Sequence, residues 1–453
     1  MEQYILKYLY DGASDEAMKR LLDYCKFQLD CRLWSAGRHI PYSYDTMREH
    51  TLYMARAMQS PRKRLRAKLH TFCQLFAKKH DKEISYQQIP TKKQTNRPFT
   101  VLSLVNIPSG SSEKIEAEGV EYYCVNMDGE QLSGYVTPAM VKIHAWYHTY
   151  VRYAVFNELI QPQNATYLDG VYHQLVEELR ALPIDAVLIR TSELFFEKMM
   201  IDAFRELGKP SITVLHGLPG IYTKATEGRA DYLTVWGEKI RENFIKVGYN
   251  PKRVFVAGNY KYDVVPNHQK LRASLEDVLV LTSAPFAEHQ HEWEWEKFEI
   301  QDRGLLITYL YSIESVLKKV GVQSARLRPH PAVNKEWLME YVDKDFYQID
   351  TLDFIQSLTQ ATLCVGQTSS TFLEALMCGV TYIPYEPSED GKNGMGRVEI
   401  VPPFDGSEKT LKTAYSEQQL LEMIESRYNP VFDMDAWMLG FDAKVIKKIL
   451  EDR

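Results

Sequence analysis

The sequence contains no apolar run that approaches the roughly 20 residues needed to cross a bilayer. Its start, MEQYILKYLYDG, lacks the basic region and the long apolar stretch of a secretory signal. An excess of basic residues is missing too, since the formal net charge is −6, and this charge gives no general attraction for nucleic acid. These absences predict a cytoplasmic protein that does not bind nucleic acid.

Metal-binding patterns are also scarce. The 6 cysteines form no Cys-x-x-Cys pair and no other spacing typical of a metal site. The segment EHQHEWEWEKFE (288–299) is rich in histidine and acid, and we interpret it as a solvated loop or helix. Two Asp-x-Asp sequences, at 343–345 and 433–435, do not follow predicted strands, and the second is typical of a helix cap. We therefore expect no metal ion and no other cofactor.

The organisation of the chain changes after its first quarter. Residues 1–95 have the pattern of helices joined by polar loops, whereas short apolar runs separated by helical patterns fill the first predicted domain, 96–265. Strands that are apolar throughout and alternate with helices indicate a parallel sheet covered on both faces. The strands expected in this domain lie within 99–110, 120–127, 185–191, 211–217, 232–237 and 254–259.

A polar stretch at 259–276 interrupts this rhythm, which then begins again in a second predicted domain, 270–430. We expect the segment 433–453 to form a helix that packs back across the linker. The sequence thus predicts an α/β protein with two Rossmann-like, doubly wound domains facing a central cleft, and a helical N-terminal segment. The strands expected in the second domain lie within 277–285, 325–331, 346–350, 361–366 and 380–386.

A loop rich in hydroxyl groups, GQTSST at 366–371, lies between a predicted strand and a predicted helix. Ligands of open parallel sheets bind beyond the carboxyl ends of the strands. Thr371 and Glu374 fit a capping box, which uses only one of the four hydroxyls. The amides at the helix start and the remaining hydroxyls are suited to hold a phosphate. The predicted phosphate-binding residues of this loop are Gln367, Thr368, Ser369 and Ser370.

A second candidate for phosphate binding is RLRPHPAV, in which His330 stands between two prolines at the end of a predicted strand. Pro331 favours an extended conformation for His330, so we expect its side chain to be rigidly aimed. With Arg328 beside it, His330 is suited to donate to a phosphate oxygen. We therefore group His330 and Arg328 with the phosphate loop.

These residues are similar to the motifs of a known superfamily. RPHP, the later SSTFLEALMCG and the PYE that follows resemble the His-Pro and Ser-Ser motifs of bacterial surface-polysaccharide transferases with the GT-B fold. That superfamily includes sialyltransferases and polysialyltransferases, Kdo transferases, and CDP-glycerol or CDP-ribitol phosphotransferases. Residues 214–263 resemble its His-Gly segment, and the whole resemblance covers about residues 185–390.

The resemblance implies roles for several residues. His330 together with Ser369 and Ser370 would hold the phosphate of the donor in place of a metal ion, and Glu374 would lie near the ribose. A helix start with His and Arg is able to offset phosphate charge in this way.

Three residues are candidates for the catalytic acid, base or nucleophile. Glu193 directly follows the strand predicted at 185–191 and is the first choice. His216 follows the next strand and matches the His-Gly motif. Asp231 comes before its strand, which favours a structural role unless the preceding loop folds into the cleft.

The leading functional hypothesis is a metal-independent glycosyltransferase. It would move Kdo or a related acidic sugar from a CMP-activated donor onto a bacterial surface glycan or glycolipid, as the resemblance implies. The alternatives are a CDP-polyol phosphotransferase, a UDP-N-acetylglucosamine 2-epimerase with the same two-domain fold, and a non-catalytic protein that binds glycan.

Residues 61–80 combine apolar side chains at helical spacing with several basic residues and no acid. A helix of this kind is able to lie on an anionic membrane surface, which transferases of lipid-linked glycans need. A helix docked on the protein shows the same apolar stripe. A peripheral position on the inner face of the cytoplasmic membrane and a purely structural role both stay open.

Overall fold

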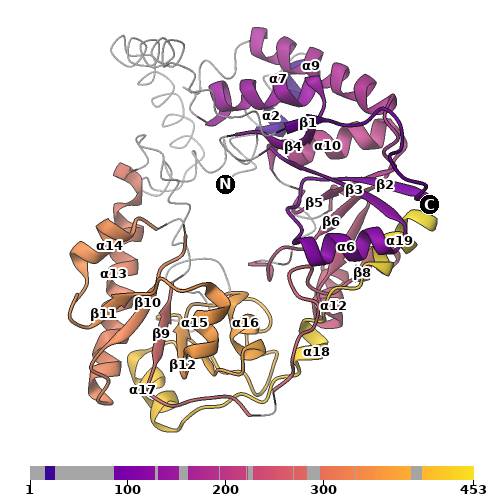
Figure 1. The fold of residues 1–453 in the computed structure, drawn as a ribbon. Coiled ribbons are helices and arrows are strands. Elements are labelled where there is room, and N and C mark those ends of the chain that lie inside the picture. Colours follow the sequence, from indigo (N-terminus) through magenta and orange to yellow (C-terminus); the bar gives the residue numbers. More distant parts are fainter. Residues whose placement is uncertain are drawn as a thin grey trace, which may run out of the picture.

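The structure, a computed structural model, forms two α/β domains connected by crossing segments (Figure 1). The first domain carries the purple and magenta elements of the figure and the second the orange ones. The described residues are 16–25, 86–127, 131–152, 162–192, 194–220, 222, 228–268, 270–282, 296–331, 333–388 and 400–452.

The first domain is built on a sheet whose described strands follow the order β1-β4-β3-β2-β5-β6-β7-β8. Neighbouring strands are parallel except β3 and β4. Every residue of β5 and β6 is buried, because helices cover both faces of the sheet. The strands are β1 (Tyr86–Gln88), β2 (Phe99–Ser103), β3 (Val120–Asn126), β4 (Ser133–Val136), β5 (Ala186–Ile189), β6 (Ser211–Val214), β7 (Tyr232–Val235) and β8 (Val254–Val256).

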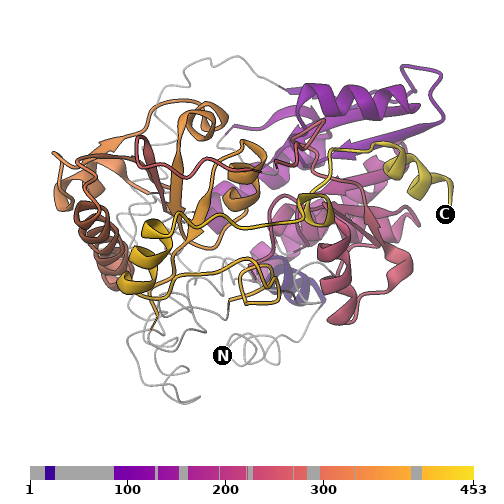
Figure 2. The same ribbon diagram turned by 90° about the horizontal axis from the view of Figure 1, so that it is seen from below.

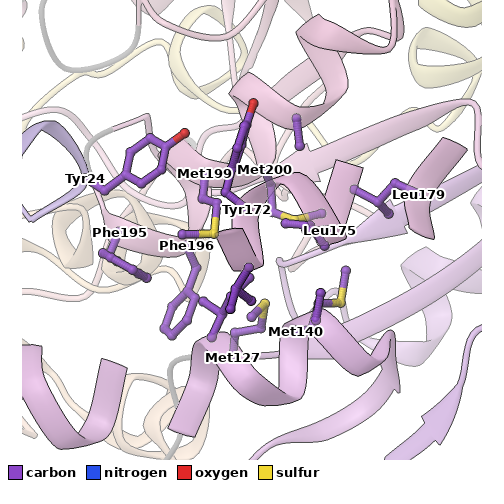
Figure 3. Packing of buried hydrophobic residues seen from close by; sticks show 14 of the residues in the cluster. Tyr24, Met127, Met140, Tyr172, Leu175, Leu179, Phe195, Phe196, Met199 and Met200 are labelled. Carbon is purple, nitrogen blue, oxygen red and sulfur yellow. The ribbon is translucent and has the colours of Figure 1, made fainter. Parts of the chain in front are cut away.

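A large apolar core lies between this sheet and the helices on one of its faces (Figure 3). The short helix α2 belongs to this core, since Tyr24 packs edge-on against Phe195 and near Tyr172. The helices of the first domain are α2 (Glu16–Tyr24), α6 (Ser109–Ala117), α7 (Pro138–Tyr147), the π-helix η1 (His148–Arg152), α9 (Pro162–Arg180), α10 (Phe195–Glu206), α12 (Glu238–Lys246) and the 3-10 helix η2 (Pro251–Arg253).

The second domain has a fully parallel sheet with the order β11-β10-β9-β12-β13. Its strands are β9 (Val278–Leu281), β10 (Ala325–Arg328), β11 (Tyr347–Ile349), β12 (Leu363–Gly366) and β13 (Tyr382–Pro384). Its helices are α13 (Glu296–Lys319), α14 (Lys335–Tyr341), α15 (Phe354–Gln360), α16 (Thr371–Met377) and α17 (Glu417–Glu425).

The predicted fold class is confirmed, since both domains have the Rossmann-like arrangement of parallel strands and helices. The sequence prediction missed β1 and β4, which extend the first sheet beyond β3. Gly134 makes the pairing of β3 and β4 so close that a Cβ atom there would lie 2.2 Å from the carbonyl oxygen of Cys124. Its φ of +84° also favours glycine.

Two segments cross between the domains (Figure 2). Residues 257–264 lead from the first domain to the second, and residues 434–442 return, passing through α18 (Met434–Trp437). The amide of Asn259 donates to the carbonyl oxygen of Leu439 over 2.8 Å, which ties the two segments together. The returning chain ends in α19 (Lys444–Glu451), whose apolar residues join a core with β2, β3, β5 and β6.

The crossing requires glycine at position 258. A Cβ atom on Gly258 would lie 2.0 Å from the carbonyl oxygen of Gly440, and its φ is +76°. We expect Gly258→Ala to lower the free energy of unfolding by about 2–3 kcal/mol, through backbone strain and overpacking. Gly208→Ala is the matched control, because Gly208 has a φ of +66° but a Cβ atom there would meet nothing within 4 Å. Urea unfolding checks both, and equal losses in the two variants would contradict a tight crossing.

The segment at 61–80 lies outside the described residues, so its predicted membrane contact stays a prediction. Within the described part of the chain, no helix is long and apolar enough to cross a membrane.

Candidate functional site

The loops that follow the strands of the two sheets approach each other between the domains. A Cβ atom on Gly217, which follows β6, would lie 3.8 Å from the Oγ of Ser370, which follows β12. In the second sheet the chain order reverses between β9 and β12, and ligands of open α/β sheets bind at such a point. The predicted His-Gly and Ser-Ser motifs are thus brought together from two different domains.

The start of the hydroxyl-rich loop is fixed by its own domain. Gln367 is buried, and its carbonyl oxygen accepts a hydrogen bond from the Tyr382 hydroxyl. The amide and hydroxyl of Thr368 both donate to one carboxylate oxygen of Glu386, each over 2.7 Å. Gln367 and Thr368 therefore hold the loop in place, while Ser369 and Ser370 keep partly exposed side chains.

The predicted capping box is wrong. Ser370, not Thr371, is the N-cap of α16, and its side chain makes no capping hydrogen bond. The Glu374 carboxylate instead accepts a hydrogen bond of 2.8 Å from the Tyr262 hydroxyl, which lies in the crossing segment. Burial raises the pKa of Glu374. Because α16 has only 7 residues, its dipole is short, and the hydroxyls of Ser369 and Ser370 are the stronger phosphate donors.

His330 and Arg328 leave β10 in different directions. The amide of His330 donates to Thr282 Oγ1 at the end of β9 over 3.2 Å. This bond holds the backbone in place next to the point between β9 and β12 where the chain order reverses. The residue as a whole is exposed, but neighbouring atoms remove part of the water around the ring, which lowers the pKa of His330. Arg328 donates to the Asp350 carboxylate over 2.7 Å and to the Ser357 hydroxyl over 3.1 Å. Arg328 therefore stabilises the second domain, and its predicted role in phosphate binding has no support in this geometry.

His216 has the geometry of a proton acceptor. Its Nδ1 lies 3.3 Å from the carbonyl oxygen of Arg190, and since a carbonyl only accepts, the neutral ring keeps Nε2 as an acceptor. Burial lowers the pKa of His216 and outweighs the hydrogen bond to the Arg190 carbonyl oxygen, which raises it, while the positive charges of Arg190 and Lys261 lower it further. The ring is therefore uncharged at neutral pH.

A buried carboxylate that contacts the side chain of Arg190 was missed in the sequence. Glu197, in the first turn of α10, is 1% exposed, and its Oε1 lies 3.3 Å from the Nε of Arg190. The same Arg190 contacts His216 through its carbonyl oxygen, so one residue connects the carboxylate and the imidazole. Glu193, the first choice from the sequence, lies outside the described residues. The signal for Glu197 was an acid one turn after Glu193, within one of the helical patterns that separate the predicted strands.

Asp231 is not part of the site. It precedes β7, and its carboxylate accepts hydrogen bonds from the amide and the hydroxyl of Ser211, over 3.0 and 2.8 Å. Ser211 is the first residue of β6, so both residues lie at the amino edge of the parallel strands, opposite the loops of the cleft. The carboxylate joins two strands, which fits the structural role that the position of Asp231 before its strand favoured over a catalytic one.

The acidic sequences considered as metal ligands have other partners. The carboxylate of Asp343 accepts from Lys318 over 2.9 Å. Asp433 caps α18 by accepting from the amide of Ala436, as the sequence predicted. Among the described residues, no group of three or more His, Cys, Asp or Glu side chains is arranged to hold a metal ion.

No family model matches the sequence, and no curated protein matches it either. Solved structures do match. UDP-GlcNAc 2-epimerase from Neisseria meningitidis, bound to UDP-GlcNAc, is 13% identical, with 81% of this chain and 100% of that chain covered and a TM-score of 0.45. The enzyme from Methanocaldococcus jannaschii, in complex with UDP-GlcNAc and UDP, is 15% identical, with 78% and 99% covered and a TM-score of 0.46. At these identities and TM-scores the likeness says nothing about the activity of this chain.

Proposed function

We propose that this protein is an enzyme that acts on a nucleotide-activated sugar. The observation that carries the proposal is the approach of the His216–Gly217 loop to Ser370. This approach places a neutral imidazole across from a group of hydroxyl donors. In this arrangement Ser369, Ser370 and His330 would bind the phosphate attached to the sugar.

The chemistry of such a substrate needs two kinds of group. The bond between the anomeric carbon and the phosphate breaks more easily when hydrogen bonds stabilise the negative charge that develops on the phosphate. A base must also take a proton, either from an acceptor hydroxyl in glycosyl transfer or from a sugar carbon in epimerisation. His216 and Glu197 are the residues proposed for this proton transfer, and Glu193 stays a sequence prediction.

Two reactions fit this arrangement. One is 2-epimerisation of UDP-GlcNAc, an alternative from the sequence and the activity named for the solved structures with a similar fold. The other is transfer of Kdo or a related acidic sugar from a CMP-activated donor to a glycan. We place epimerisation first, because it is the activity named for solved structures with a similar fold, whereas the transfer reaction rests on the sequence resemblance alone.

The two reactions are separated by incubating the protein with UDP-GlcNAc in D₂O and, separately, with CMP-, CDP- and other UDP-sugars. Epimerisation is expected to give UDP-N-acetylmannosamine with deuterium at C2, which proton NMR detects, whereas a transferase slowly releases free nucleotide. CDP release from a CDP-sugar would indicate a different enzyme, which uses a CDP-activated substrate and carries out neither of these two reactions. Absence of both conversion and nucleotide release for all these sugars would overturn the proposed function in favour of a non-catalytic binding protein.

A further inference from the structure

We propose that a pocket beside the segment 257–264, which joins the two domains and is treated as the hinge, binds a small organic anion with an apolar portion. This hinge pocket is separate from the phosphate loop, and the inference does not depend on the proposed function. Its volume is about 550 Å³, which is in the range of small-molecule sites.

Three parts of the chain form the hinge pocket. From the first domain, the start of α6 contributes Gly110, and the crossing segment 257–264 contributes Lys261 and Tyr262. From the second domain, the end of α16 contributes Met377 and Cys378. Neither Ser369, Ser370 nor His330 lines it. A ligand in the hinge pocket would therefore touch both domains and the segment that connects them, without occupying the proposed phosphate site.

The charge of the pocket favours an anion. Of its two charged lining residues, Asp263 is neutralised by Lys114, which lies 2.9 Å away. Lys261 is exposed, and within the described part of the chain no carboxylate lies within ion-pair distance of its ammonium group. Its positive charge reaches further, since it partly offsets the burial that raises the pKa of Glu374 and adds to the lowering of the pKa of His216. The pocket thus offers one ammonium group that is available to a ligand.

The other wall of the pocket is apolar. It includes Val264, which is 74% exposed, together with Pro266, Ile355 and Met377. Apolar side chains gathered beside an unneutralised ammonium group favour a ligand with a ring or hydrocarbon part and one anionic group, such as a carboxylate, sulfonate or phosphate. The His268 ring, which donates to the carbonyl oxygen of Met377 over 3.1 Å, also lines the pocket.

Cys378 provides a reporter inside the hinge pocket. We use 8-anilinonaphthalene-1-sulfonate as an anionic probe and N-phenyl-1-naphthylamine as its analogue without the sulfonate. The readout is the rate of iodoacetamide alkylation at Cys378, measured on its peptide by mass spectrometry. Because burial raises the pKa of the Cys378 thiol, the labelling is done at about pH 8.5. We expect saturating sulfonate probe to slow alkylation by about threefold or more, and the uncharged analogue to slow it much less.

Variants then assign this protection to the pocket. Lys261→Gln is expected to abolish protection by the sulfonate probe, whereas Lys270→Gln, on the same linker but outside the pocket, is expected to retain it. The double variant Ser369→Ala with Ser370→Ala is also expected to retain it, which separates this pocket from the proposed phosphate site.

A further variant tests whether filling the hinge pocket protects Cys378 in the absence of a probe. A Cβ atom on Gly110 would meet nothing within 4 Å, so Gly110→Leu should fill part of the pocket and slow alkylation without any probe. Unchanged alkylation at Cys378 with the sulfonate probe, or equal protection in the Lys261→Gln variant or by the uncharged analogue, would overturn the proposal. Circular dichroism of each variant confirms that it is folded.

Discussion

Replacing Ser369 and Ser370 together by alanine is expected to lower the turnover of a nucleotide sugar by about a hundredfold or more, because preorganised donors to a developing phosphate charge are lost. His330→Ala should have a similar effect. The loop itself should survive, since its position depends on the bonds from Thr368 to Glu386 and from Tyr382 to Gln367. Steady-state kinetics, with circular dichroism to confirm folding, measure the effect.

Arg328→Gln is the control for this prediction. Its guanidinium is bonded to Asp350 and Ser357, so the variant should lose about 1–3 kcal/mol of unfolding free energy, the cost of an underpaired buried carboxylate. Turnover of the molecules that remain folded should be nearly unchanged. A large loss of turnover in Arg328→Gln, with full activity in the double serine variant, would show that phosphate binds along β10 instead.

The strands that the sequence predicted most clearly are buried on both faces. Runs such as AVLI in β5 and VLVL in β9 are apolar throughout because helices cover both sides of the sheet. The two missed strands lack that signal. β1 is YQQ and β4 is SGYV, and only their pairing with each other and with β3 makes them strands. Pairing between distant segments is not visible in a local pattern.

The same limit explains the errors in the candidate site. The capping box of Thr371 and Glu374 is a correct local pattern, but Tyr262, distant in the sequence, takes the carboxylate instead. Asp231 is held by Ser211 from the neighbouring strand. The positions of His216 and Ser370 could be predicted, because they follow from the rule that loops after parallel strands meet at one edge.

Glu197→Gln is expected to lower turnover by about a thousandfold while preserving nucleotide binding. A buried carboxylate that acts in proton transfer contributes on the order of 10²–10⁴ to the rate, and glutamine keeps its shape but cannot accept the proton. The variant also removes the negative charge of Glu197 from beside Arg190, so we expect the pKa of the His216 imidazole to fall further. Kinetics and nucleotide titration by calorimetry measure the two effects separately.

Asp231→Ala is the matched comparison, because it removes a carboxylate from the same domain at the opposite edge of the sheet. It leaves the amide of Ser211 without its acceptor, which should cost about 1–3 kcal/mol of unfolding free energy, while turnover per folded molecule stays near that of the unchanged protein. If instead Asp231→Ala abolishes turnover at full stability and Glu197→Gln remains active, the acid of the reaction lies elsewhere. Glu193→Gln then becomes the decisive variant, since Glu193 is the remaining acidic candidate from the sequence.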